Sequence, residues 1–281
     1  EDQYGNDGNF FAGVRQSRFG VKAKMPTALG EVKTTFEFEL FGTGADAGQT
    51  TFRLRHAYGE LGHWGAGQTW SPFMDVDVFP NSLEYWGPAG MVFFRNIQLR
   101  WMPIQGDTFL TFALERPGAS GDSGTYGDRV ELQNVKGRFP YPDLSAEYRM
   151  GTDWGYLELA GIVRYIKWED MLQDQYDLSG SDLGWGLNVS SNVKLGKNVL
   201  RLQAVYGEGI ENYMNDAPAD LGPRLNPGSA TRPLVGELLP VLGLVAFFDL
   251  NWSDKMSSTI GYSSVDIDNS TGQAGDAFSK G

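Results

Sequence analysis

Apolar and polar residues alternate with a period of two along twelve stretches of the chain, and this pattern predicts β-strands. In the stretch 31–41, Val32, Phe36 and Leu40 share one face, and Lys33 and Glu37 lie on the other. Later stretches such as 183–194 behave in the same way, and the weakest are 64–70 and 256–265. The alternation predicts an all-β protein.

The breaks between these stretches are alternately short and long. The short breaks are Pro26–Gly30, Gly62, Pro103–Asp107, Gly151–Asp153, Gly196–Asn198 and Ser253–Lys255. The long breaks are Gly42–Thr50, Ser71–Met91, Pro117–Tyr141, Glu169–Asp182, Gly207–Leu239 and the residues beyond Val265. An antiparallel meander with tight turns at one end and long loops at the other is typical of a transmembrane β-barrel.

The polar face of the predicted strands carries full charges of both signs at strand centres. In a barrel these charges would face a wet lumen and the apolar face would meet lipid. Aromatic residues near strand ends on the apolar face fit the rings of a membrane interface, and they are Trp101, Trp252, Tyr165, Tyr206 and Tyr262. No run of about eighteen apolar residues exists, so no helical span is predicted.

Both ends of the chain fall on the long-loop side of the predicted meander. Bacterial barrels have an even number of strands, normally with both termini on the short-turn side. We therefore expect residues 1–281 to be a single porin β-barrel domain truncated at both ends, with about twelve strands of a barrel of at least fourteen and more simply sixteen. A barrel of that size leaves an aqueous channel.

The composition narrows the function classes. The net charge of −12 and the pI of about 4.6 make nucleic acid an unsuitable partner. The absence of cysteine excludes disulfides and thiolate metal sites. The only two histidines, His56 and His63, make a poor metal site, and His56 is expected on the outward face. No nucleophile or phosphate-loop motif is present, so we predict no enzyme activity, no metal and no cofactor.

The long break 71–91 reads SPFMDVDVFPNSLEYWGPAGM and is rich in aromatic and apolar residues. A loop in water would be more polar, so we expect this one to fold into the lumen as a constriction loop. Its pore-facing charges would be Asp75, Asp77 and Glu84. The alternative is a loop packed on its own aromatics at the rim.

A set of basic residues on nearby strands has lumen parity: Arg18, Lys22, Lys24, Arg53, Arg55 and Arg100. Such cations favour passage of anions, and an arginine fork matches a carboxylate. In the alternative, these residues pair with Glu31, Glu37, Glu39 and Glu60 and only line the wall.

Residues 15–96 resemble the DcaP-like porins of Gram-negative outer membranes. The similarity lies in the combination of RQSRFG, FRLRHAYGEL, GQTWSPFMD and VFFRN, which covers roughly the first third of the chain. The resemblance implies a sixteen-stranded homotrimeric porin in the bacterial outer membrane, in contact with lipid and lipopolysaccharide. It also implies uptake of dicarboxylates and other small anions, with the basic constriction on Arg18, Lys22, Arg53, Arg55 and Arg100 and with Asp75 and Asp77 on the loop.

The sequence therefore predicts an outer-membrane porin for passive diffusion of small hydrophilic solutes, preferentially anionic and dicarboxylate-like. One alternative is a carbohydrate-selective porin, for which Trp64, Trp70 and Trp86 are the only candidates for an aromatic track along the lumen. The alternative from another class is a secreted β-rich glycoside hydrolase, which would place two carboxylates in an aromatic cleft.

Overall fold

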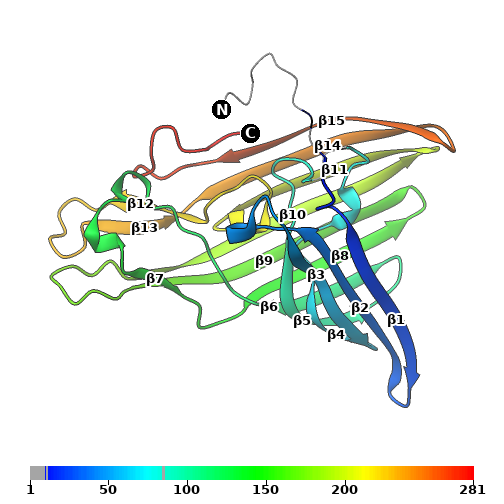
Figure 1. Ribbon diagram of the computed structural model, residues 1–281, viewed down its shortest axis with the longest axis horizontal. Coiled ribbons are helices and arrows are strands. Elements are labelled where there is room, and N and C mark those ends of the chain that lie inside the picture. Colours follow the sequence, from blue (N-terminus) through cyan, green and yellow to red (C-terminus); the bar gives the residue numbers. More distant parts are fainter. Residues whose placement is uncertain (1–9, 11, 84–85) are drawn as a thin grey trace.

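Twelve strands follow one another as neighbours in a single antiparallel sheet, in chain order (Figure 1). The structure is a computed structural model that describes residues 10, 12–83 and 86–281. The strands are β1 (Arg18–Thr27), β2 (Gly30–Phe41), β3 (Thr50–Leu61), β4 (Trp64–Trp70), β5 (Arg95–Ile104), β6 (Phe109–Glu115), β8 (Asp143–Thr152), β9 (Gly155–Asp170), β10 (Gly180–Leu195), β11 (Asn198–Glu208), β14 (Pro240–Ser253) and β15 (Met256–Ile267). Each corresponds to one of the twelve predicted stretches, so the predicted meander is confirmed.

Three further strands lie inside the long breaks and were not predicted. β7 (Val135–Arg138) joins the sheet by pairing with the end of β9, and β12 (Leu221–Leu225) pairs with β13 (Leu234–Leu238) in a small separate hairpin. The helices of the described residues are 3-10 turns: η1 (Gly44–Asp46), η2 (Val76–Val78), η3 (Gly124–Tyr126), η4 (Val130–Leu132) and η5 (Glu211–Tyr213). None of the described helices has the length and apolar character needed to cross a membrane.

The alternation of short and long connections holds in the structure. Tight turns join β1 to β2, β3 to β4, β5 to β6, β8 to β9, β10 to β11 and β14 to β15. Glycines with positive φ angles stand in several of them, as Gly30, Gly62 and Gly196 do, because these turns need a left-handed backbone. In Figure 1 the turns that follow β8, β10 and β14 lie together at one end of the sheet, and the longest loops lie at the other.

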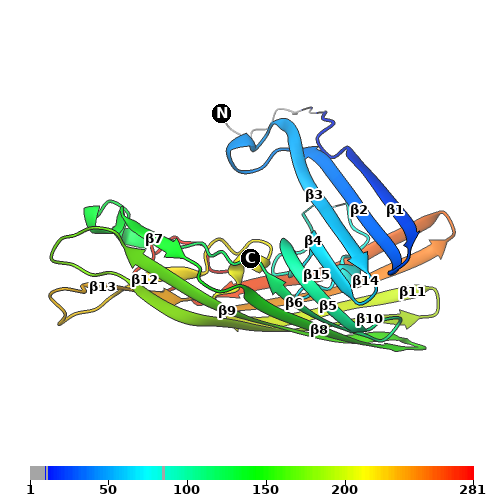
Figure 2. The ribbon, with the colours of Figure 1, turned by 90° about the horizontal axis from the view of Figure 1, so that it is seen from below.

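The distribution of apolar and polar side chains between the two faces of the sheet is the reverse of that in a soluble protein. On β9, Leu157 and Leu159 are 43% and 52% exposed, whereas Glu158 between them is 1% exposed. The sheet curls, with β1–β3 rising away from the plane of β8–β11 (Figure 2), so that one face is concave. Apolar side chains cover the outer face and polar ones face inward, which is the arrangement that a lipid environment outside and water inside require.

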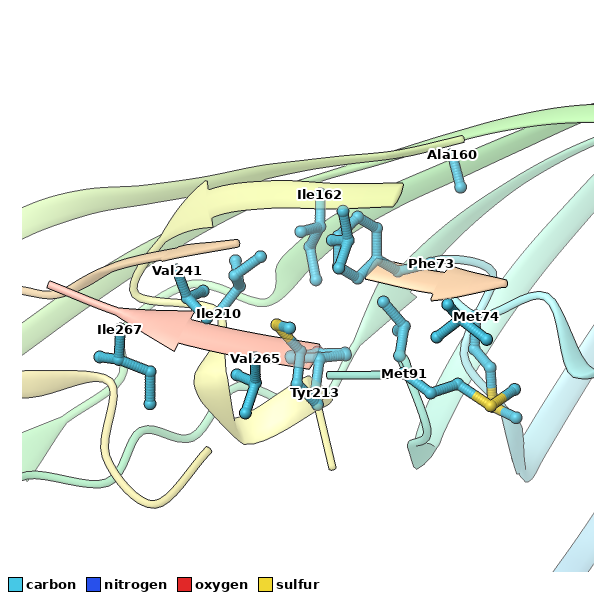
Figure 3. Packing of buried hydrophobic residues seen from close by; sticks show 14 of the residues in the cluster. Phe73, Met74, Met91, Ala160, Ile162, Ile210, Tyr213, Val241, Val265 and Ile267 are labelled. Carbon is cyan, nitrogen blue, oxygen red and sulfur yellow. The ribbon is translucent and has the colours of Figure 1, made fainter. Parts of the chain in front are cut away.

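The main hydrophobic cluster lies on the concave face, between the wall and two segments that fold against it (Figure 3). The segment between β4 and β5 contributes Phe73, Met74, Val78, Met91 and Val92, and the segment after β11 contributes Ile210, Tyr213 and Met214. The wall contributes residues of β9, β11, β14 and β15 such as Ile162, Val205, Val245 and Val265. The wall is made of small residues where the segments approach it, since a Cβ atom on Gly186 would stand 2.8 Å from the Phe73 ring.

A register shift between β2 and β3 changes the face of the sheet on which part of the β3 side chains lie, relative to the face expected from parity. Glu37 pairs with His56 and Phe38 with Leu54, so Arg55 is the extra residue of a β-bulge. Beyond the bulge, the side chains of His56 and Tyr58 lie on the concave face. The expected outward position of His56 is therefore wrong: it is buried, with Nδ1 3.0 Å from the Thr69 hydroxyl.

Candidate functional site

The segment 71–94 lies across the concave face, and Asp75 is its main anchor. The Asp75 carboxylate accepts hydrogen bonds from Arg149 Nη2 on β8 (2.7 Å), Tyr156 Oη on β9 (2.7 Å) and Ser190 Oγ on β10 (2.6 Å). Asp75 also caps η2 by accepting from the Asp77 amide. It is 1% exposed, so this residue, expected to face the pore, is instead held against the wall by three strands.

Asp77 is more open. Its side chain is 54% exposed, and Oδ2 lies 2.5 Å from Arg149 Nη1. Its backbone carbonyl accepts from Asn192 on β10 and from Arg201 on β11. Of the two loop aspartates, Asp77 is the one whose charge reaches open space on the concave side.

Both ends of the segment are also tied to the wall. Ser71 Oγ donates to Glu115 Oε1 on β6 at 2.7 Å. Farther along, Asn81 Nδ2 donates to Ser257 Oγ on β15 at 2.9 Å, and the Gly90 carbonyl accepts from Gln203 on β11. Glu84, the third predicted loop acid, lies outside the described residues. The described part of the segment therefore contacts strands from β6 to β15.

Arg18, Arg53 and Arg55 of the predicted basic set gather around two carboxylates of β2. Arg55 is 7% exposed at its side chain and lies 2.9 Å from both Glu37 and Glu39. Arg18 approaches the same two carboxylates at 3.4 and 3.6 Å, and Arg53 approaches Glu39 at 3.4 Å. Arg55 is thus neutralised in place, whereas the side chains of Arg18 and Arg53 stay 43% and 26% exposed.

The other predicted basic residues lie apart from that cluster. Arg100 on β5 donates to Gln98 Oε1 and to the Trp70 carbonyl, and its guanidinium lies over the Tyr58 ring at 5.3 Å. Lys22 and Lys24 are exposed on β1, and neither forms an ion pair with a described residue. The structure thus brings three of the six predicted cations together and leaves three elsewhere on the concave face.

The strand pattern already held a signal for cations that the predicted set omits. Arg149 and Arg201 have lumen parity, and both hold the segment 71–94. Arg95 gave the opposite signal, because it shares strand parity with the outward Ile97 and Leu99. An arginine at a position of lipid-facing parity breaks the period-two alternation of the strand, and this exception is the sequence signal for Arg95.

A buried ion cluster holds the loops at the long-loop end. The guanidinium of Arg164 on β9 is fully buried and lies 3.1 Å from Asp143 and 2.9 Å from Asp220. It also donates to the carbonyls of Gly118 and Gly209. One arginine therefore joins β8 and β9 of the wall to two loops, the one after β6 and the one after β11.

Glu211 in η5 lies close to this cluster. It is fully buried, and neither carboxylate oxygen has a hydrogen-bond partner among the described residues. Burial, assisted by the nearby Asp220 carboxylate, raises the pKa of Glu211 to about 9. The group is therefore neutral at pH 7 while the loop is in place.

Two other kinds of site, an aromatic track for sugars and a metal site, find little support on the concave face. Trp64 lies on the outer face, 55% exposed and stacked on Trp101 at 6.4 Å, so only Trp70 and Trp86 of the three candidates for a lumen track remain. Within the described ranges, no group of three or more histidine or acidic side chains is arranged to hold a metal ion.

Comparisons with known proteins agree on the kind of molecule. The model of the family described as DcaP outer membrane protein matches residues 8–216. The crystal structure of the outer membrane channel DcaP of Acinetobacter baumannii has a TM-score of 0.72 and 19% identity, covering 90% of this chain and 67% of that one. The trimer form of OmpT, an outer membrane protein of Vibrio cholerae, has a TM-score of 0.56 and 12% identity, covering 94% and 73%. No curated protein matches the sequence.

Proposed function

The chain belongs to the DcaP outer membrane protein family and is an outer-membrane porin, and from that premise we propose that it passes small anionic, dicarboxylate-like solutes by passive diffusion. The segment 71–91 acts as the constriction loop. No bond is made or broken. The wall attracts the solute, the constriction limits its size, and binding stays weak enough for release.

The distribution of charge on the concave face supports the anion preference. Among the residues that the structure describes, Arg18, Arg53 and Arg55 share two carboxylates, Glu37 and Glu39. Lys22 and Lys24 on β1 add positive charge without forming ion pairs with described residues. The excess of cations on this wall lowers the barrier for a negative solute.

The loop acids stand on the other side of the passage. Asp75 and Asp77 are bonded to the wall formed by β8–β11, with Arg149 between them. The exposed Asp77 on the loop side and an excess of cations on β1–β3 create a transverse field, which orients a solute with charge at its ends. A dicarboxylate responds to that field more strongly than a neutral sugar of similar size.

We also propose that the protein works as a homotrimer in contact with lipid and lipopolysaccharide. The support is the trimer form recorded for the OmpT structure, which shares the fold. The exposed apolar outer face fits lipid contact.

The test is a planar-bilayer recording of the full-length protein under a salt gradient. We expect conductance steps in groups of three and a reversal potential that indicates anion selectivity. Cation selectivity would contradict the basic constriction while leaving the porin assignment intact. A replacement of Arg53 by serine should reduce the anion preference, and unchanged selectivity would remove that residue from the constriction.

A further inference from the structure

Arg95, the first residue of β5, has a charge that no carboxylate of the described chain neutralises. It forms no ion pair within 4.0 Å there. Its Nη1 atom is buried and donates to no acceptor among the described residues. A buried charge without a partner is unfavourable, so such a group needs either an unusual environment or a ligand that binds it.

The environment of Arg95 is cationic. The charged side chains with the largest electrostatic effect on Arg95 are Arg55 and Arg53. The carboxylate of Glu39 comes next and opposes them, and Arg18 follows. Arg18, Arg53 and Arg55 share the two carboxylates of Glu37 and Glu39, and Arg95 pairs with neither. The local excess is two positive charges, and Arg95 is the member without a partner.

A cavity lies beside this group. Its volume is about 220 Å³, and it is lined by Arg53, Leu54, Gln68, Trp70, Phe93, Phe94 and Arg95. It forms where β3 parts from β4, because the ladder between these strands covers only Ala57–Leu61 of β3. Gln68 Nε2 occupies part of the gap by donating to the carbonyls of Leu54 and Arg55. Because β3 and β4 separate here, the side chain of Arg95 can lie near the arginines of the concave face although its position in β5 has outward parity.

Trp70 holds the guanidinium in a fixed orientation. The guanidinium carbon of Arg95 is 4.6 Å from the centre of the Trp70 ring, and that of Arg55 is 5.6 Å from it. A guanidinium stacked on an indole keeps its N–H edge free for a planar acceptor. Trp70 and Phe93 also form an apolar wall of the cavity, in ring contact at 5.2 Å.

We propose that Arg95, supported by Arg53, is the carboxylate-binding subsite of this pore, with Trp70 and Phe93 receiving the hydrocarbon part of a short carboxylate. The inference rests on the proposed anion-selective function and deepens it. The cavity is smaller than the roughly 300 Å³ at which pockets for drug-sized ligands begin, so the solute class is a carboxylate of a few carbons.

A second cavity extends the subsite and favours a dicarboxylate. It measures about 280 Å³ and shares Gln68, Phe94 and Arg95 with the first. It adds Arg116, which is exposed and forms no ion pair with a described residue. Arg53, Arg95 and Arg116 thus line two adjoining cavities, and a solute with two carboxylates can engage two of them in turn. Several weak sites in series allow binding without blocking flux.

The experiment measures the block of chloride current by succinate in single channels of the full-length protein. The bilayer is zwitterionic, so that no anionic lipid headgroup competes for the site. The variant is Arg95→Gln, and the control is Lys194→Gln, which removes one positive charge from an exposed lysine of β10. Heat-dependent mobility in gels establishes that each variant is folded.

We expect Arg95→Gln to weaken the succinate block about tenfold, because a charge-assisted hydrogen bond is lost, and Lys194→Gln to change it little. Acetate should block weakly in the wild type and respond less to the substitution. Arg95→Lys should restore only part of the effect, since a lysine keeps the charge but not the fork.

The outcomes separate this inference from the function on which it rests. A wild-type channel that is anion-selective and blocked by succinate, with Arg95→Gln unchanged, would refute the subsite alone. Equal weakening in Arg95→Gln and Lys194→Gln would also refute it, by reducing the effect to net charge. A wild-type channel without anion preference would refute the proposed function. Succinate block that is lost when anionic lipid is added to the bilayer would assign the cavity to a lipid headgroup and overturn the proposal.

Discussion

Replacing Asp75 by asparagine should loosen the segment 71–94 from the wall and produce larger, noisier conductance. The carboxylate is buried and binds Arg149, Tyr156 and Ser190 on three different strands. Removing one partner of a buried charge pair costs about 3–5 kcal/mol. The lower end applies, because Arg149 keeps Glu158 at 2.6 Å. A cost of about 3 kcal/mol shifts the ratio of seated to displaced segment by a factor of about 100.

The assay is a single-channel amplitude histogram at fixed salt, recorded for the wild type, Asp75→Asn and Asp77→Asn. Asp77→Asn is the matched control, since it removes the same charge from the same turn. The Asp77 side chain is 54% exposed, so its loss should cost no more than about 1 kcal/mol. We expect a new high-conductance level in Asp75→Asn only. Identical histograms for Asp75→Asn and the wild type would refute the anchoring role, and equal changes in both variants would attribute the effect to charge.

Three other substitutions test the fold and the loop contacts. Leu187→Arg on the outer face should destabilise the folded protein by about 2–4 kcal/mol in a lipid bilayer, measured by unfolding in urea, whereas Lys194→Arg, at an exposed position on the inner face of the same strand, should change stability little. Arg164→Met should lower stability by about 3–5 kcal/mol, because two buried carboxylates lose their cation; unchanged protease resistance of the loops would contradict this. Burial raises the pKa of Glu211 from 4.5 to about 9, so the unfolded loop ionises first and loop stability should fall by about 1.4 kcal/mol per pH unit between those values. Glu211→Gln should remove that dependence, as measured by hydrogen exchange of 209–214 at pH 6 and 8.

The sequence alone was sufficient for the meander. Strand existence depends on a period-two pattern that local sequence carries directly, and the sorting of loops by end follows from where glycine and proline interrupt it. All twelve strands of the meander lie where that pattern placed them. β7, β12 and β13 escaped prediction because they are only four or five residues long and lack a clear period-two pattern. β12 and β13 pair with each other within one long loop, and β7 pairs with the end of β9.

The positions of individual side chains on the concave face depended on the tertiary structure. Parity predicts a face only while the register is regular, and the bulge at Arg55 reverses it for His56. The parting of β3 from β4 draws Arg95 toward cations that parity places on the opposite face.

The different burial of the two loop aspartates could not be predicted from the sequence either. Asp75 and Asp77 are two residues apart and chemically identical, yet one is 1% exposed and the other has a side chain 54% exposed. The difference arises because Arg149, Tyr156 and Ser190 converge on Asp75 from three strands distant in the chain. The local pattern thus determined the barrel wall and the loop that crosses it, and only packing between distant strands decided which charges stay open to a solute.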